Sequence, residues 1–121
     1  MSERRENLVR EKSFVFALHI VSLVKLLQTE KKEFVLSKQL LRSGTAIGAL
    51  VREAEHAQSK ADFIIKMSIA LKEANETDYW LDLLHYSDYL DEDSYAIIHP
   101  VIQELIKLLV SIVKTAKGIK N

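Results

Sequence analysis

The chain has 121 residues, 48% of them hydrophobic and 28% charged, which is typical of one folded domain and excludes an intrinsically disordered chain. It contains no cysteine, which excludes a disulfide framework, a zinc site with thiolate ligands and a cysteine nucleophile. Its 17 basic and 17 acidic residues cancel, which argues against strong, sequence-independent binding of nucleic acid.

The first predicted helix runs from Asn7 to Thr29. The residues before it are charged and no small-residue cleavage site follows them, so we expect no signal peptide. The apolar stretch Phe14–Leu27 is interrupted by His19 and Lys25, and we expect it to be too short to span a bilayer. With the absence of cysteine, these features predict a cytoplasmic protein with no membrane partner.

The second predicted helix runs from Ser37 to Gln58 and contains an unusual pair of glycines. Gly44 and Gly48 lie four residues apart in mid-helix, where each glycine costs about 1 kcal/mol relative to alanine. Because glycine has no side chain, the pair makes a smooth surface that another backbone can approach closely. Close packing inside a bundle is the simpler explanation, and a hinge or a ligand groove is the alternative.

The third predicted helix runs from Lys60 to Ser87 and opens on a capping box. Ser59 is the expected N-cap, and Asp62 takes the place of the usual glutamate. Apolar and small residues then alternate in steps of three and four, which predicts one buried seam. The seam consists of Phe63, Met67, Ala70, Ala74, Thr77, Leu81 and Leu84.

A second apolar stripe lies on the same helix, rotated by well over about 90° from the seam, since each residue of a helix turns by roughly 100°. It consists of Ile65, Ile69, Trp80 and Leu83. A four-helix bundle buries one face of each helix, so a second face that includes a tryptophan predicts a contact between subunits. The alternative is that the first or the fourth helix wraps far enough to cover the stripe.

The fourth predicted helix runs from Glu92 to Lys117. Acidic residues in its first turn suit the helix dipole, and Gly118 is the expected stop. Short connections between four helices make successive helices antiparallel. The sequence therefore predicts an all-α protein, a single domain over residues 1–121 that folds as an antiparallel up-down-up-down four-helix bundle.

Two carboxylate–histidine pairs have, or nearly have, the spacing used by di-iron sites in helical bundles. They are Glu53 with His56, and Asp82 with His85. Antiparallel pairing about the turn between the second and third helices separates the two pairs by roughly 27 Å, at 1.5 Å per residue. We therefore expect no metal site and no cofactor.

No catalytic constellation is predicted. His19, His85 and His99 are isolated in the sequence, and no serine, histidine and acid are expected to converge. Arg52 and His56 resemble the arginine–histidine pair of helical ribonucleases of the HEPN type, but their spacing is one residue short and they lie in the second helix. We expect neither an enzyme nor a small-molecule substrate, with a ribonuclease acting through His56 as the remote alternative.

Three charged residues are expected to meet between the second and third helices. Antiparallel pairing places Arg42 opposite position 75, close to Glu73 and Glu76. A guanidinium held by one or both carboxylates near the seam would be a structural ion pair that fixes the register of the helices. We favour this role over catalysis.

Charge is distributed unevenly along the predicted bundle. The start of the first helix and the end of the fourth share one pole, where basic residues gather, and the opposite pole is acidic. The basic residues are Arg4, Arg5, Arg10, Lys12, Lys114, Lys117 and Lys120. A ring of parallel subunits would repeat this pole into a basic rim suited to phosphates of RNA. Complementarity with the helix dipoles is the simpler explanation.

A long string in the second and third helices resembles the proteins encoded within 23S rRNA intervening sequences. The resemblance starts at Arg42–Ala49, continues through Glu53-Ala54 and ends at Tyr79-Trp80-Leu81, so that it covers about half of the chain. Relatives usually have serine and asparagine where this chain has Ala46 and Leu50. The resemblance implies a four-helix bundle that assembles into rings, commonly of five subunits, with a largely undefined role.

The same fold is similar to that of the accessory protein of diversity-generating retroelements, a basic pentamer that binds a reverse transcriptase and nucleic acid. This chain is neutral, so that chemistry does not transfer intact. The leading hypothesis is a non-catalytic homo-oligomer, expected to be a pentamer, that acts as an accessory factor for RNA or a ribonucleoprotein. The alternative is a protein-binding scaffold with no role on nucleic acid.

Overall fold

The computed structural model describes residues 2–119. Its four helices are α1 (Ser2–Thr29), α2 (Leu36–Glu55), α3 (Lys60–Tyr86) and α4 (Glu92–Lys117). They take in more than four-fifths of the described residues, among which there is no β-strand. The all-α class predicted from the sequence is confirmed.

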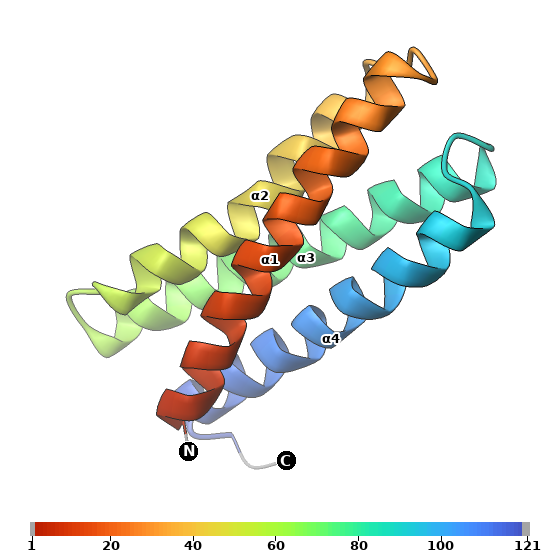
Figure 1. Ribbon diagram of the computed structural model, residues 1–121. Coiled ribbons are helices and arrows are strands. Elements are labelled where there is room, and N and C mark those ends of the chain that lie inside the picture. The colour runs from red at the N-terminus through yellow and green to blue at the C-terminus, as the bar shows by residue number, and fades with distance from the viewer. Residues whose placement is uncertain (1, 120–121) are drawn as a thin grey trace.

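Successive helices run in opposite directions, so that α1 begins beside the end of α4 (Figure 1). Each helix packs on two neighbours: α1 on α2 and α4, and α3 on α2 and α4. The diagonal pairs, α1 with α3 and α2 with α4, have no Cα atoms within 8 Å of each other in the part of the chain that the structure describes. The antiparallel up-down-up-down topology expected from the short turns is the one in Figure 1.

The core fills the space between all four helices. Its largest fully buried side chains come from every helix at helical spacing. They are Phe16, Ile20, Leu27, Leu40, Ile47, Met67, Leu81, Leu84, Ile98, Ile102, Leu105 and Leu109. Two buried hydroxyls join α2 to α3 inside this apolar layer, where Thr77 Oγ1 donates to Ser43 Oγ at 2.9 Å.

The ends of α1 and α2 differ most from the prediction. Helix α1 begins at Ser2, five residues before the predicted Asn7. Helix α2 begins at Leu36 and ends at Glu55, three residues before the predicted Gln58. It ends early because Gln58 and Ser59 form the N-terminal cap of α3 instead. Asp62 N donates to Ser59 Oγ, and Gln58 N donates to the Asp62 carboxylate.

The glycines of α2 pack against α1. A Cβ atom at Gly44 would lie 3.0 Å from the side chain of Ile20, and one at Gly48 would lie 3.4 Å from the carbonyl oxygen of Ser13. Glycine therefore permits the close approach of two helices, which is the simpler of the two explanations offered by the sequence.

Two helices are long and apolar enough to cross a membrane by length and composition alone: α1 over Glu3–Thr29 and α4 over Glu92–Lys117. The expectation that the first apolar stretch is too short was wrong in this respect, because the helix extends well beyond Phe14–Leu27. Both helices also supply buried side chains to the bundle, and the core helices of a soluble protein meet the same criterion.

Candidate nucleic-acid interface

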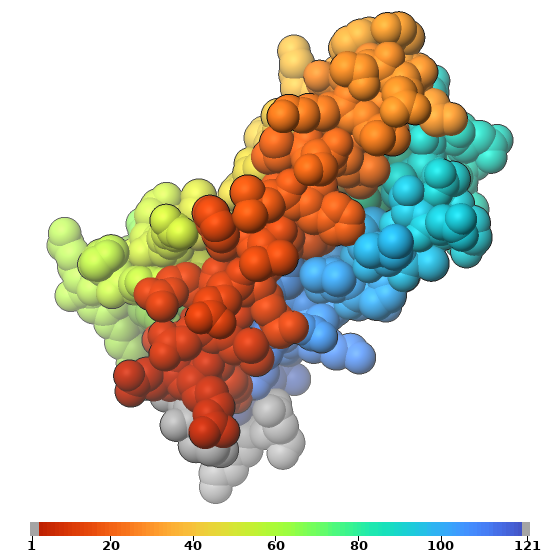
Figure 2. Space-filling view, in the orientation of Figure 1, coloured from red at the N-terminus to blue at the C-terminus, as the bar shows by residue number. Residues whose placement is uncertain are grey.

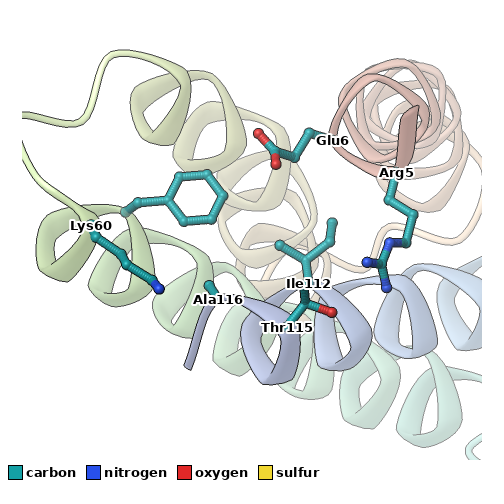
Figure 3. Close-up of a pocket in the computed structure, with 7 residues that line it drawn as sticks. Arg5, Glu6, Lys60, Ile112, Thr115 and Ala116 are labelled. Carbon is teal, nitrogen blue, oxygen red and sulfur yellow. The ribbon is translucent and has the colours of Figure 1, made fainter. Parts of the chain in front are cut away.

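Three helix ends converge at the pole that carries the N-terminus of α1. The first turns of α1 and α3 meet the last two turns of α4 around a cavity of about 350 Å³ (Figure 3). It is lined by Arg5, Glu6, Lys60, Phe63, Ile112, Thr115 and Ala116. Two cations and an aromatic ring therefore lie in the wall of one open cavity at this pole.

The two cations flank the cavity from opposite sides (Figure 3). Arg5 comes from α1 and is half-buried, and its Nη1 donates to Ser111 Oγ of α4 at 2.5 Å. Lys60, the first residue of α3, is exposed. Glu6 lies on the third side and offsets part of the positive charge.

The predicted basic residues fall into two groups. Arg10 and Lys12 are already paired with acids on other helices: Arg10 lies 3.5 Å from Glu55, and Lys12 forms an ion pair with Glu104. Because these carboxylates neutralise them, the structure does not support the expectation that Arg10 and Lys12 are available for phosphate.

Arg4, Lys114 and Lys117 are exposed and form no ion pair with another described residue. Lys114 and Lys117 lie in the last turn of α4, which ends at Gly118 in a left-handed conformation with φ of 77°. Lys120 lies outside the described residues. The basic pole is therefore defined here by Arg4, Arg5, Lys60, Lys114 and Lys117.

The apolar stripe predicted on α3 is partly exposed. The side chains of Ile65 and Ile69 are 55% and 40% exposed, whereas Trp80 and Leu83 are half-buried. The Trp80 ring packs against the core and lies edge-on to Tyr79, with ring centroids 5.1 Å apart. The stripe is therefore most exposed at its N-terminal end, at Ile65 and Ile69. The Trp80 side chain packs in part against the subunit's own core.

Sequence reasoning missed a larger apolar surface on α1. No other helix covers the outward side of α1, which runs across the face of the molecule in Figure 2. The exposed hydrophobic side chains of this outer face are Leu8, Phe14, Val15, Leu18, Val21 and Leu26. The signal in the sequence was the run Phe14–Leu27, which is apolar on nearly all sides of the helix. Such a pattern is typical of a helix that is buried on more than one side.

Arg42 lies between the two glutamates named from the sequence. Its Nη1 is 3.2 Å from Glu73 Oε1, and its Nη2 bonds Glu76 Oε2. The side chain of Arg42 is 50% exposed, whereas that of Glu73 is 18% exposed. The pair therefore lies at the edge of the α2–α3 contact rather than in the core, and water screens it.

Two histidines described above as isolated are not isolated in the structure. Tyr95 stacks on His85 with a centroid distance of 4.0 Å and on His99 with a distance of 4.6 Å. His99 also approaches Asp78 and Asp82 of α3. The spacing of Asp78 and Asp82, one turn apart, was visible in the sequence, but their meeting with α4 depends on how the two helices are rotated.

Residues 5–111 match the family model described as 23S rRNA-intervening sequence protein. A solved structure, a protein with unknown function from the S23 ribosomal protein family of Bacteroides thetaiotaomicron, is similar with a TM-score of 0.89. The two sequences are 57% identical over 91% of this chain and 98% of that one. None of the curated proteins matches this chain. On the family match and this identity, the chain belongs to the 23S rRNA intervening-sequence protein family.

Proposed function

We propose that this protein is a non-catalytic, homo-oligomeric RNA-binding protein and that RNA binds at the basic pole. The observation that carries the proposal is the cavity between α1, α3 and α4, which has Arg5 and Lys60 on opposite sides. Arginine and lysine bind phosphate oxygens, and affinity for RNA comes largely from such contacts.

The cavity also has a surface for a base. The half-buried ring of Phe63 lines it beside the apolar side chain of Ile112. A base that is splayed out of an RNA loop stacks on aromatic rings, while the neighbouring phosphates pair with cations. Glu6 lies in the same wall, so a single pole has modest affinity and several copies are needed for tight binding.

The apolar surfaces support self-association. The outer face of α1 and the exposed part of the α3 stripe lie on helices that are diagonally opposed in the bundle. If the α1 face of one subunit covers the α3 stripe of the next, the contact is heterologous, and such contacts form a ring when the rotation between subunits closes. Subunits in a ring point the same way, so the basic pole repeats on one rim.

Charge reversal separates binding at the pole from other modes. Arg4→Glu, Lys60→Glu and Lys117→Glu should each weaken binding of a labelled stem-loop RNA at low ionic strength, and the triple variant should abolish it. Lys38→Glu is the matched control, because this exposed lysine lies at the start of α2, near the other pole, and the substitution changes the charge equally. Circular dichroism and light scattering check that helicity and mass are retained.

Equal loss of affinity in the control and in the pole variants would show nonspecific charge attraction and would contradict a site at the pole. Absence of RNA binding by the unmodified protein would support a protein-binding scaffold in its place. The same incubations test the non-catalytic assignment, because the RNA should stay intact. Cleavage that disappears in His56→Ala would support a ribonuclease. The geometry does not favour this alternative, because Arg52, the other member of the pair, lies over the ring of Phe14, 5.1 Å from its centroid.

A further inference from the structure

Three metal-ligating side chains converge between α3 and α4, about midway between the α3–α4 turn and the centre of the bundle. Asp78 and Asp82 lie one turn apart on α3, and His99 faces them from α4. His99 Nε2 is 3.2 Å from Asp78 Oδ1 and 3.7 Å from Asp82 Oδ1. One donor atom from each residue lies within 4.8 Å of the other two.

Neighbouring side chains hold this cluster in place. Tyr95 donates a hydrogen bond of 2.6 Å to Asp82 Oδ1, and its ring stacks on His99 at an interplanar angle of 15°. On its other side, Tyr95 stacks on His85. His85 is turned away from the cluster, because its Nδ1 faces the carbonyl oxygen of Leu90 and its Nε2 faces Glu92.

The Asp78 carboxylate has one nearby cationic partner among the described residues, His99. Its Oδ1 atom is buried and accepts no hydrogen bond from the described residues, although His99 Nε2 is close. A buried carboxylate oxygen that accepts no hydrogen bond is costly, and a cation bound to it removes that cost.

We propose that Asp78, Asp82 and His99 bind a divalent transition-metal ion, for which zinc is the best fit. Zinc–ligand bonds of about 2.0–2.2 Å in tetrahedral geometry place neighbouring donor atoms about 3.3–3.6 Å apart. The distances from His99 to the two carboxylates bracket that range. The remaining separation closes by rotation of the aspartates about χ2, which is a soft torsion.

The donor set and the exposure define what the site would hold. An imidazole nitrogen beside two carboxylates suits zinc and its neighbours in the first row better than magnesium or calcium, which prefer oxygen alone. The side chains are 23–44% exposed, so water can fill the fourth position. Tyr95 would orient the Asp82 ligand as an outer-shell partner. The site lies away from the basic pole and does not depend on RNA binding.

Calorimetric titration of the metal-free protein with ZnCl2 tests the site. We expect one zinc ion per chain in the unmodified protein, and a melting temperature that rises with zinc concentration. His99→Gln and Asp82→Asn should lose more affinity than the roughly 10- to 100-fold typical of an outer-shell partner, whereas Tyr95→Phe should lose about 10-fold. Magnesium at the same concentration should give no comparable stabilisation.

Two matched controls locate the ion. His56→Gln removes an exposed histidine at the end of α2, and His85→Gln removes the nearest histidine outside the proposed ligand set. Both should bind zinc within a few-fold of the unmodified protein, and metal-free melts of every variant check the fold. Absence of zinc binding, or binding lost in His85→Gln and kept in His99→Gln, would overturn the proposal. In the first case the approach of His99 to the two aspartates has a structural role only.

Discussion

At the scale of single residues, the two glycines of α2 differ in the space around them. A Cβ atom at Gly44 would lie 3.0 Å from the side chain of Ile20, which is fully buried and would have to shift. A Cβ atom at Gly48 would make an ordinary contact of 3.4 Å with the carbonyl oxygen of Ser13. Their substitution by alanine should therefore have opposite effects on stability.

Gly44→Ala should lower the free energy of unfolding by about 1 kcal/mol, because overpacking costs about 1–3 kcal/mol and helix propensity returns about 1 kcal/mol. Gly48→Ala should raise it by up to about 1 kcal/mol through propensity alone. Urea denaturation measures both as shifts of the midpoint at constant slope. Stabilisation by both substitutions would show that α1 moves easily relative to α2.

The ion pair of Arg42 illustrates how exposure limits a charge interaction. The sequence predicted the partners, but it also suggested a pair near the core seam, whose disruption costs about 3–5 kcal/mol. With Arg42 half exposed, Glu73→Ala should lower the free energy of unfolding by about 1 kcal/mol or less. A double-mutant cycle with Arg42→Ala should give a coupling of about 0.2–1 kcal/mol; a value above 3 would contradict a solvent-screened pair.

At the scale of helices, starts that carry a usual N-cap residue were predicted more accurately than the start that does not. Helix α3 begins after Ser59, and α4 begins after Asp91, whose side chain accepts a hydrogen bond from Ser94 N. These caps can be read within three residues of sequence, so both starts were predicted correctly. The start of α2 depends instead on Glu33, which the sequence does not mark as a cap.

Glu33 is buried and satisfies several amides at once. Its carboxylate accepts hydrogen bonds from the backbone N–H groups of Val35, Leu36 and Ser37 at 2.7–3.1 Å. Glu33→Ala should lower the free energy of unfolding by about 1–3 kcal/mol, because it leaves the buried N–H of Ser37 and two part-buried N–H groups without this partner. Glu33→Gln keeps an acceptor oxygen and should cost less. Equal, negligible effects in thermal melts would mean that water replaces the cap.

At the candidate interface, the position of the basic pole follows from the topology, whereas the ion pairs of its residues depend on how each helix is rotated about its axis. Antiparallel helices necessarily bring Arg4 and Lys117 to one pole, so the pole was predictable from helix count alone. The pairing of Arg10 with Glu55 and of Lys12 with Glu104 depends on how each helix is rotated about its axis. The hydrophobic periodicity does not define that rotation closely enough to predict individual ion pairs. The prediction therefore counted Arg10 and Lys12 as free cations, and overestimated the unpaired positive charge at the pole.

At the scale of the whole molecule, two apolar surfaces on diagonal helices predict assembly by a heterologous contact. Light scattering at tens of micromolar protein should give the mass of a closed ring, for which five subunits are expected. Leu18→Glu on the α1 face and Ile65→Glu on the α3 stripe should each abolish the ring and leave helicity unchanged.

A mixture of these two variants distinguishes the kind of contact. Each variant keeps one intact surface, so Leu18→Glu and Ile65→Glu should combine into a dimer that neither forms alone. A contact of α1 with α1 would behave differently, since Ile65→Glu would then assemble normally. A monomer mass for the unmodified protein would contradict the account of both surfaces.

The most direct measurement of the central claim is the affinity of the unmodified protein for a structured RNA as a function of salt concentration. We expect measurable binding near 50 mM salt that falls steeply as salt rises, with a log–log slope of about 0.7–0.9 for each phosphate neutralised. In a ring that repeats the basic pole, several phosphates should contribute to that slope. No binding near 50 mM salt, or an affinity that does not change with salt, would contradict an RNA site built on Arg4, Arg5, Lys60, Lys114 and Lys117.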